Sequence, residues 1–392
     1  MAKEARLAAR IEAVQPFHVM ALLARARELE SQGRDIVHME IGEPDFPTPE
    51  PIVRAGIEAL QAGHHHYTPA QGLPALRQAI SADYATRYGI EIDPGRILIT
   101  PGSSGALQLL MSVLINPGDQ VLMADPGYPC NRNFVRLVDG DVGAIAVTGS
   151  SNYQLTIDHL QTHWNDNTRA VLLASPANPT GALIAAEEMK VISDFVTQRG
   201  GHLLVDEIYH GLVYDTKAQT ALALSDDVFV INSFSKFFGM TGWRLGWLVA
   251  PQQYVDAFDK VAQNIFLAAS TPAQHAALAA FHPTTMKLLE QRRQTFQARR
   301  DYLLPALESL GFKFDSVAQG AFYLYADCSQ HTEDSAAFCR ALLEEGGVAT
   351  TPGKDFGDYR SNRRIRFAYT TSLSRLKEGV KRISGFLQTR QH

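Results

Sequence analysis

The sequence predicts an α/β fold, in which a large domain with a mainly parallel sheet covered by helices is joined to a smaller α+β domain. Short apolar runs alternate with helical stretches through the middle of the chain, as in a parallel sheet covered by helices. Polar residues follow several of these runs where the strands should end. The chain has 392 residues and 45% hydrophobic content. This is enough for two domains, because single cores stop growing near ~250–300 residues.

The expected large sheet consists of five short apolar segments, at residues 97–100, 121–124, 170–174, 202–205 and 228–231. The first segment runs into Pro101-Gly-Ser-Ser-Gly105 and then a predicted helix over 106–115, and a turn at 116–119 leads to the second. The polar residues that follow the segments include Ser103, Asn178, Asp206 and Ser233. Because ligands bind at the carboxyl ends of the strands in open α/β sheets, we expect these side chains to share one site.

The C-terminal part predicts the smaller domain. A helical stretch over 283–310 precedes strands at 320–325, 348–350 and 365–369 and a helix at 335–345. The last helix has apolar residues at helical spacing, from Leu376 to Leu387, and the first thirty or so residues indicate another amphipathic helix. We therefore expect an N-terminal segment over 1–44 that packs with the small domain, a large domain over 45–282 and a small C-terminal domain over 283–392.

Charge and composition argue against several classes of protein. The formal net charge is −5, with Lys and Arg spread along the chain, which argues against a nucleic-acid binder. No apolar run approaches the ~18 residues of a membrane span, and the N-terminus has no signal-peptide pattern. Cys130, Cys328 and Cys339 form no CxxC pair, so we expect buried thiols in a reducing compartment. A cytoplasmic protein is the simplest expectation.

Residues 233–247, Ser-Phe-Ser-Lys-Phe-Phe-Gly-Met-Thr-Gly-Trp-Arg-Leu-Gly-Trp, predict a cofactor anchor. A lysine that loses its proton can form a Schiff base with an aldehyde, and Lys236 stands here among apolar and aromatic neighbours. Ser233, Ser235 and Arg244 supply the hydroxyls and the cation that suit a phosphate. The segment therefore predicts a site for pyridoxal phosphate (PLP). An ordinary surface lysine is the alternative, which the apolar flanks disfavour.

Other segments add partners for the same cofactor. Gly102-Ser-Ser-Gly105 lies between a strand and a helix, where backbone N–H groups bind phosphate, although strand–glycine–helix turns are common without a ligand. Asp206 would keep a pyridine nitrogen protonated, because an adjacent anion raises the pKa of a cation; a helix N-cap is its alternative. Tyr209 and Asn178 are the expected partners of the phenolic oxygen, with a plain Asn-Pro turn as the alternative for Asn178.

Seven motifs in order carry a family resemblance. They are Gly42-Glu-Pro-Asp45, Tyr67-Thr-Pro-Ala-Gln-Gly72, Asn178-Pro-Thr-Gly181, Asp206-Glu-Ile-Tyr209, Ser233-Phe-Ser-Lys236, Gly242-Trp-Arg244 and Ile365-Arg-Phe367. From about residue 15 to the C-terminus, the chain resembles the class I/II aminotransferases, which are PLP enzymes of fold type I. The resemblance implies a ping-pong exchange of an amino group between an amino acid and a 2-oxo acid.

The resemblance also implies roles around the cofactor. Lys236 would be the Schiff-base lysine and general base, Asp206 would pair with the pyridinium, and Tyr209 would bind the phenolate together with Asn178. Tyr128 would stack on the ring. The phosphate would be held by Ser103, Ser104, Ser233, Ser235 and Arg244. Relatives often have a lysine or a larger polar residue near position 104, so with serine we expect a shorter or backbone-only contact there.

The remaining roles concern the substrate and a second subunit. Arg366 would clamp the substrate α-carboxylate in a bidentate pair, with Asn178 and the Gly42 backbone nearby. Strand alternation puts Arg364 on the same face, which makes it the fallback. Tyr67 would reach the phosphate of the neighbouring subunit in a homodimer with shared active sites.

The substrate side chain is the least determined part of the prediction. An expected wall without permanent charge consists of Phe17, His18, Phe266, Phe322 and Tyr323, although aromatic residues also pack in cores. With no second cation identified for a distal carboxylate, we expect neutral or aromatic amino acids as substrates.

Two alternatives to an aminotransferase stay open on the residues alone. A carbon–sulfur β-lyase is the main one, because a fold does not fix the reaction. A non-catalytic PLP-sensing regulator would need a DNA-binding module, for which we expect no room, and Lys236 is intact. The tract His64-His65-His66 predicts no metal site, because three consecutive residues cannot all face one ion.

Overall fold

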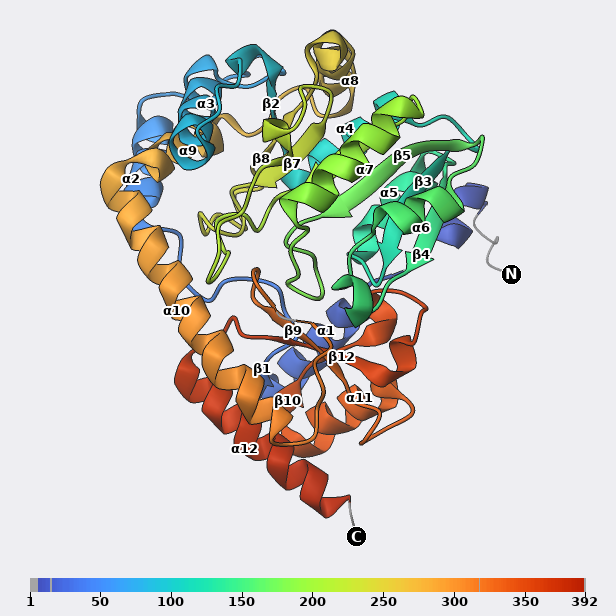
Figure 1. The fold of residues 1–392 in the computed structure, drawn as a ribbon. Helices are drawn as coiled ribbons and strands as arrows, with labels where there is room; N and C mark the ends of the chain where they lie inside the picture. Colours follow the sequence, from blue (N-terminus) through green and yellow to red (C-terminus); the bar gives the residue numbers. More distant parts are fainter. Residues whose placement is uncertain (1–5, 15, 317, 391–392) are drawn as a thin grey trace.

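The computed structural model describes residues 6–14, 16–316 and 318–390, which form two lobes (Figure 1). The large lobe contains a seven-stranded sheet in the order β2-β8-β7-β6-β5-β3-β4. Strand β8 runs antiparallel to both of its neighbours, β2 and β7, and the other pairs of the sheet are parallel. The strands are β2 (Ile97–Thr100), β3 (Gln120–Asp125), β4 (Asp141–Ala146), β5 (Thr168–Ala174), β6 (His202–Asp206), β7 (Phe229–Ser233) and β8 (Gly246–Val249). The predicted mainly parallel sheet is therefore confirmed.

Helices cover both faces of this sheet (Figure 1). They are α2 (Glu50–Gln61), α3 (Pro74–Tyr88), α4 (Gly102–Leu114), α5 (Pro129–Leu137), α6 (Ile157–His163), α7 (Ala186–Gln198), α8 (Val255–Ile265) and α9 (Thr271–Leu278). Within a strand, successive side chains enter different cores: Phe229 and Ile231 pack with α4 and α8, whereas Val230 packs on the opposite side with Ile192 of α7. This burial on both faces explains why the central strands are continuous apolar runs.

The small lobe contains a three-stranded antiparallel sheet in the order β11-β12-β9. Its strands are β9 (Tyr323–Asp327), β11 (Thr351–Pro352) and β12 (Arg364–Ala368), and its helices are α11 (Ser335–Gly346) and α12 (Leu373–Thr389). Helix α10 (Pro283–Glu308) runs from the large lobe down to the small lobe (Figure 1). The predicted mixture of strands and helices in this region is therefore confirmed.

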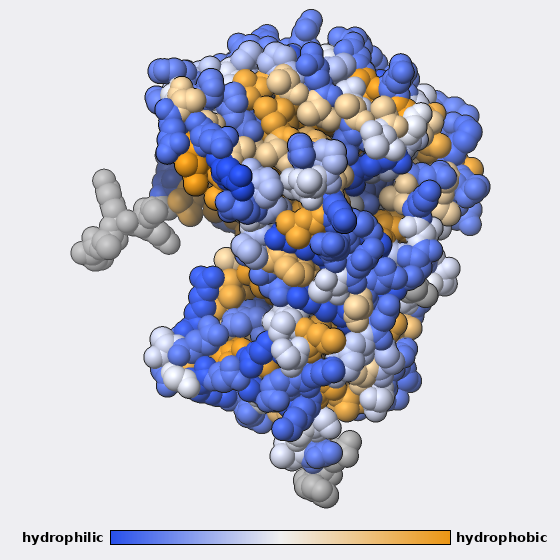
Figure 2. All heavy atoms as spheres, turned by 90° about the vertical axis from the view of Figure 1, so that its left-hand side faces the viewer, coloured by the Kyte–Doolittle hydropathy of each residue, from blue (hydrophilic) through white to orange (hydrophobic). Residues whose placement is uncertain are grey.

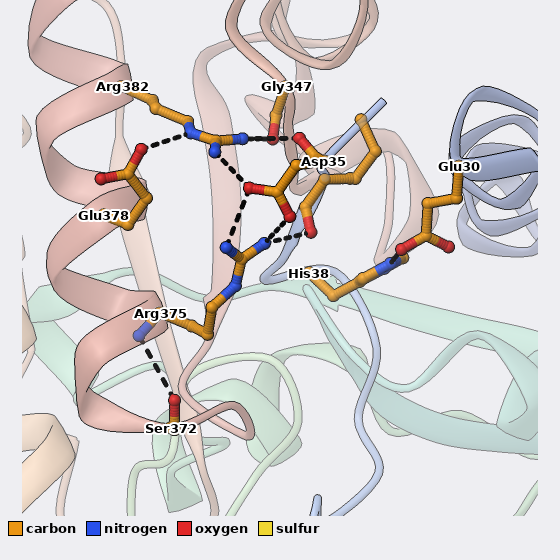
Figure 3. A network of polar contacts seen from close by, with 9 residues as sticks. Glu30, Asp35, His38, Gly347, Ser372, Arg375, Glu378 and Arg382 are labelled. Carbon is orange, nitrogen blue, oxygen red and sulfur yellow. Dashed lines mark hydrogen bonds and ion pairs between the residues drawn. The ribbon is translucent and has the colours of Figure 1, made fainter. Parts of the chain in front are cut away.

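The N-terminal segment lies against the small lobe. Strand β1 (Val37–His38) pairs in parallel with β10 (Val348–Ala349), and α1 (His18–Ser31) contacts β10 and β11. Asp35 accepts hydrogen bonds of 3.0 and 2.7 Å from Arg375 of α12 and also pairs with Arg382 (Figure 3). These two arginines lower the pKa of Asp35 to about 2. The division of the chain into an N-terminal segment, a large domain and a small domain stays a prediction.

Two helices begin at other residues than predicted. The amphipathic N-terminal helix begins only at His18, because Pro16 lacks the backbone N–H that a continuous helix needs; residues 1–5 of that prediction lie outside the described residues. Helix α4 begins at Gly102 rather than at residue 106, so the serines of the Gly-Ser-Ser-Gly segment lie in its first turn. No helix of the described ranges is long and apolar enough to cross a membrane.

Candidate active site

A cavity of about 490 Å³ holds almost all the residues that the sequence singled out. The large lobe, the small lobe and the N-terminal segment all contribute to its wall. The predicted residues that line it are Gly42, Ser103, Ser104, Tyr128, Asn178, Asp206, Tyr209, Ser233, Ser235, Lys236, Arg244 and Arg366. The chemistry-bearing side chains of distant motifs are therefore brought to one place.

Strand ends position the polar groups on the large-lobe side. Asp206 is the last residue of β6 and Ser233 is the last residue of β7. Ser103 and Ser104 follow β2 in the first turn of α4, and Asn178 lies in the loop after β5. Parallel strands end at the same edge of a sheet, so these side chains converge as the sequence predicted.

Lys236 is a half-buried residue, and the pKa of its amine is lowered to about 8. Removal from water is the main cause, and the nearby positive charges of Arg366 and Arg244 add to it. Its Nζ donates a hydrogen bond of 2.7 Å to the carbonyl oxygen of Gly42. A lysine with this pKa is partly neutral near neutral pH, which is the state that attacks a carbonyl group.

Asp206 is a buried carboxylate that faces the cavity. Burial raises its pKa to about 6, although the N–H of Ile208, at 3.1 Å, and the charge of Lys236 act in the opposite direction. Among the described residues it forms no ion pair within 4.0 Å. A buried carboxylate of this kind suits a positively charged partner in the cavity, because that partner would offset its desolvation.

The predicted phosphate contacts form a cradle around the beginning of α4. Pro101 at the N-cap position gives no side-chain cap to the first N–H groups of the helix. A Cβ on Gly102 would come within 2.5 Å of Arg244, and one on Gly246 within 2.8 Å of the Ser103 backbone nitrogen. These glycines therefore let the arginine and the strand β8 backbone approach the helix N-terminus, which favours anions.

Arg366 lies on the small-lobe side with a buried guanidinium group. It donates 2.9 Å to Oδ1 of Asn178 and 2.5 Å to the backbone oxygen of Glu40. Its Nε has no partner, and within the described part of the chain the group pairs with no carboxylate within 4.0 Å. Unpaired buried donors beside a cavity suit a carboxylate ligand. The fallback, Arg364, is absent from the cavity wall and pairs with Asp315 at 2.7 Å, so this arginine does not take the predicted role.

Tyr67 is the predicted cofactor-binding residue that does not line the cavity. Its side chain is 84% exposed and borders a separate surface depression with Gln71, Asp259 and Leu267. The predicted contact with a cofactor in a second subunit requires such an exposed position. That role stays a prediction.

The expected aromatic wall is only partly correct. Phe17 and Tyr323 line the cavity, but His18 is exposed and Phe322 is buried against Tyr209, 5.4 Å between ring centroids. Phe266 packs instead with the core under α4 and α8. Residues that sequence reasoning missed are Val19, Met20, Ile41, Glu43, Leu107, Thr241, Asp355 and Phe356. Val19 and Met20 come two and three residues after Phe17, but no sequence pattern shows that the start of α1 reaches this cavity.

The structure also bears on the other sequence candidates. Within the described ranges, no group of three or more His, Cys, Asp and Glu side chains could hold a metal ion. His64 stacks on His275, with 4.4 Å between ring centroids. Cys328 and Cys339 are buried and Cys130 is half-buried, and burial raises the pKa of all three thiols.

The chain is similar to known proteins over nearly its whole length. Residues 34–383 match the family described as aminotransferase class I and II. The chain is 38% identical to a valine–pyruvate aminotransferase of Mycobacterium tuberculosis, covering 95% of this chain and 97% of that protein. It is 38% identical to a (5-formylfuran-3-yl)methyl phosphate transaminase of Methanocaldococcus jannaschii, covering 97% of this chain and 99% of that protein. It is also 34% identical to an aspartate aminotransferase of Bacillus sp. strain YM-2, covering 97% and 99%.

Solved structures agree with these similarities. A crystal structure of an aminotransferase from M. tuberculosis superimposes with a TM-score of 0.95 at 38% identity, covering 98% of this chain and 100% of that one. The structure of the aspartate aminotransferase of Thermus thermophilus with maleate gives a TM-score of 0.92 at 30% identity, covering 97% and 100%. The predicted fold type is thereby confirmed.

Proposed function

The chain belongs to the class I and II aminotransferases and catalyses transamination, and from this premise we propose that its cavity holds pyridoxal 5′-phosphate and takes amino acids with a neutral side chain. The observation that carries the proposal is the cavity itself. The wall of one cavity contains Lys236, Asp206 and Arg366. Lys236 is an amine of lowered pKa, Asp206 is a buried carboxylate that forms no ion pair among the described residues, and Arg366 is a buried cation.

The residues of the large lobe fit PLP. The cradle at the start of α4, with Arg244, Ser233 and Ser235, would hold its phosphate. Asp206 would pair with its ring nitrogen, Tyr128 would lie against the ring, and Tyr209 and Asn178 would bind its phenolic oxygen. When bound, PLP supplies an aldehyde that accepts the amino group and a protonated ring that stabilises the negative charge left on carbon.

The residues of the chain would then bind, orient and move protons. Lys236 would hold the cofactor and move a proton at its Nζ, which the lowered pKa near 8 favours at neutral pH. Asp206 would hold the proton on the ring nitrogen, because its carboxylate forms no ion pair with any cation among the described residues. Arg366 would bind the α-carboxylate of the amino acid and so orient the Cα–H bond toward the lysine.

The side chain of the substrate would face apolar groups. The cavity wall includes Phe17, Val19, Met20 and Phe356. Its cationic side chains are Lys236, Arg244 and Arg366, each of which already has a proposed role. No described cation of the wall is left for a distal carboxylate, which supports neutral substrates.

Exposed apolar residues support a homodimer. Ile57 and Leu60 of α2 are 50% and 55% exposed, and Leu267, after α8, is 44% exposed. Figure 2 views the molecule from the side on which α2 and α9 lie in Figure 1, and it shows apolar residues gathered on the surface of the large lobe. Contiguous apolar surface of this kind favours association. The exposed Tyr67 could then complete the site of the second copy.

The test is to add single amino acids to purified, PLP-loaded protein and follow the visible spectrum. Leucine, valine, alanine and phenylalanine should convert bound PLP into pyridoxamine phosphate, and the matching 2-oxo acid should reverse the change. If the protein takes up no PLP, or if no amino acid changes the spectrum, the proposed function is wrong.

A further inference from the structure

A carboxylate of the cavity wall, Asp355, caps a helix that is distant in sequence. Asp355 ends the short 3-10 helix Gly353–Asp355 and is 5% exposed. Its Oδ1 accepts the backbone N–H of His18 at 2.7 Å, and its Oδ2 accepts that of Val19 at 3.0 Å. Phe17, at the N-cap position of α1, has no side-chain acceptor for these groups. Asp355 therefore satisfies from another part of the chain the free N–H groups at the start of α1.

This cap places part of the cavity wall. Phe17, Val19 and Met20 all line the cavity, and the ring of Phe17 lies 6.2 Å from that of Tyr128. On the other side, Phe356 follows Asp355 directly and lies 4.8 Å from the Arg366 guanidinium. The two hydrogen bonds of Asp355 therefore join the apolar start of α1 to the chain beside the proposed carboxylate clamp. Hydrogen bonds to a charged acceptor are about twice as strong as neutral ones.

The same contact fills a position that a second carboxylate would favour. The N-terminus of a helix binds carboxylates through its free N–H groups and its positive dipole end. At the start of α1 these N–H groups lie beside the cavity, and Asp355 already occupies them. An acidic substrate side chain would meet a fixed negative charge there and would find its donors taken. The wall also carries the carboxylate of Glu43, which Thr241 contacts at 2.5 Å.

We propose that Asp355 is a specificity-determining residue, which takes the place of a substrate's distal carboxylate at the start of α1. It thereby disfavours aspartate and glutamate and holds Phe17 and Val19 as an apolar wall for neutral side chains. The inference rests on the proposed function, since it takes an amino acid bound through Arg366 as the substrate.

The test compares Asp355→Ala and Asp355→Asn with the unchanged protein. For each protein, kcat and KM are measured with leucine and with glutamate. The Ala variant frees both N–H groups and removes the charge, so the ratio of kcat/KM for glutamate over leucine should rise at least tenfold, mainly through a lower KM for glutamate. The Asn variant removes the charge but keeps one acceptor of the same shape, so a smaller rise is expected.

A second readout does not depend on activity. Hydrogen exchange of the peptide that spans residues 17–31 should be faster in Asp355→Ala than in the unchanged protein, with Asp355→Asn between them. The matched control is Glu344→Gln, which removes the exposed 2.6 Å ion pair between α1 and α11 made by Arg25. This control should speed exchange in α1 and leave the glutamate-to-leucine ratio unchanged.

Each outcome of these measurements either supports or overturns the proposed role of Asp355 in specificity. A tenfold rise in the ratio, absent in Glu344→Gln, supports it. Faster exchange with an unchanged ratio, or an equal loss for both substrates, means that Asp355 is only a structural cap and overturns it. If Asp355→Ala does not fold, the ratio of the Asn variant decides. Failure of the proposed function looks different, because then the unchanged protein would convert bound PLP with neither amino acid.

Discussion

The amino group of Lys236 lies 2.7 Å from the backbone oxygen of Gly42, so the proposed anchor in the large lobe contacts the N-terminal segment. Met39 of that segment in turn accepts a backbone hydrogen bond of 2.7 Å from Ala368, which ends β12 of the small lobe. The lysine therefore stands where three parts of the chain meet. Burial at this junction is the main cause of its lowered pKa.

The first prediction concerns the protonation of Lys236. Burial lowers its pKa to about 8 from an ordinary value of 10.5, so the neutral amine forms as the pH rises through 8 rather than through 10.5. In PLP-free protein, the rate at which an amine-reactive reagent labels Lys236 should therefore rise with pH and reach half its maximum near pH 8. Peptide mapping at each pH measures it, with exposed Lys190 as the internal control. A midpoint near 10.5 would contradict the lowered pKa of Lys236.

The second prediction concerns Asp206. Replacing it with Ala removes the carboxylate proposed to keep the ring nitrogen protonated, so kcat should fall on the order of 10³-fold, about 4 kcal/mol in barrier. The matched control is Glu207→Gln. Glu207 is the next residue and equally buried, but it binds Thr220 and Ala221 and does not line the cavity. This control should keep kcat within a few-fold, and near-normal kcat in Asp206→Ala would reject the assigned role.

The third prediction separates two arginines of one strand. Arg366→Lys loses the planar pair of donors proposed for the substrate α-carboxylate, and kcat/KM should fall on the order of 100-fold, about 3 kcal/mol. Arg364→Lys makes the same chemical change two residues away, where the side chain pairs with Asp315 and Asp327. It should lower the melting temperature with little effect on kcat/KM. Equal losses of kcat/KM in the two variants would contradict the assignment.

The polar residues of the site could be predicted from the sequence more completely than the rest of the cavity wall. Lys236, Asp206 and Asn178 could be placed because each follows a continuous apolar strand, and parallel strands end at one edge. Strand β4 escapes prediction because only Ile145 of its residues is buried and because it includes Asp141 and Gly143, so it is no continuous apolar run. The contribution of Asp355 depends on a contact over 337 positions in sequence, for which a single sequence carries no signal.

A related cause explains why Phe266 and Phe322 do not line the cavity as the sequence predicts. Phe266 and Phe322 were chosen by residue type alone, and the sequence does not say on which side of a chain segment a ring packs. Phe322 lies in the turn before β9, and its ring centroid is 4.9 Å from that of Tyr323. Tyr323 lines the cavity, whereas Phe322 packs behind it in the core.

The fourth prediction concerns the second subunit. If Tyr67 completes the site of a neighbouring copy, Tyr67→Ala and Lys236→Ala should each lose activity. Lys236→Ala removes the lysine from the subunit's own site, whereas Tyr67→Ala removes the tyrosine from the site of the neighbouring copy. Unfolding and refolding the two variants together should form hybrid dimers that contain one intact site and regain up to about a quarter of the activity of the unchanged protein. A stable, fully active monomer in sedimentation would refute the shared site, and so would a mixture that regains nothing while hybrid dimers form.

The most direct test of the account is to find which residue holds the cofactor. Purified protein is loaded with PLP, reduced with borohydride, digested and mapped by mass spectrometry. We expect a single phosphopyridoxyl label on Lys236, close to one per chain, and loss of that label in Lys236→Arg. A label at full occupancy on any other lysine, or a label that persists in Lys236→Arg at the same level, would contradict it.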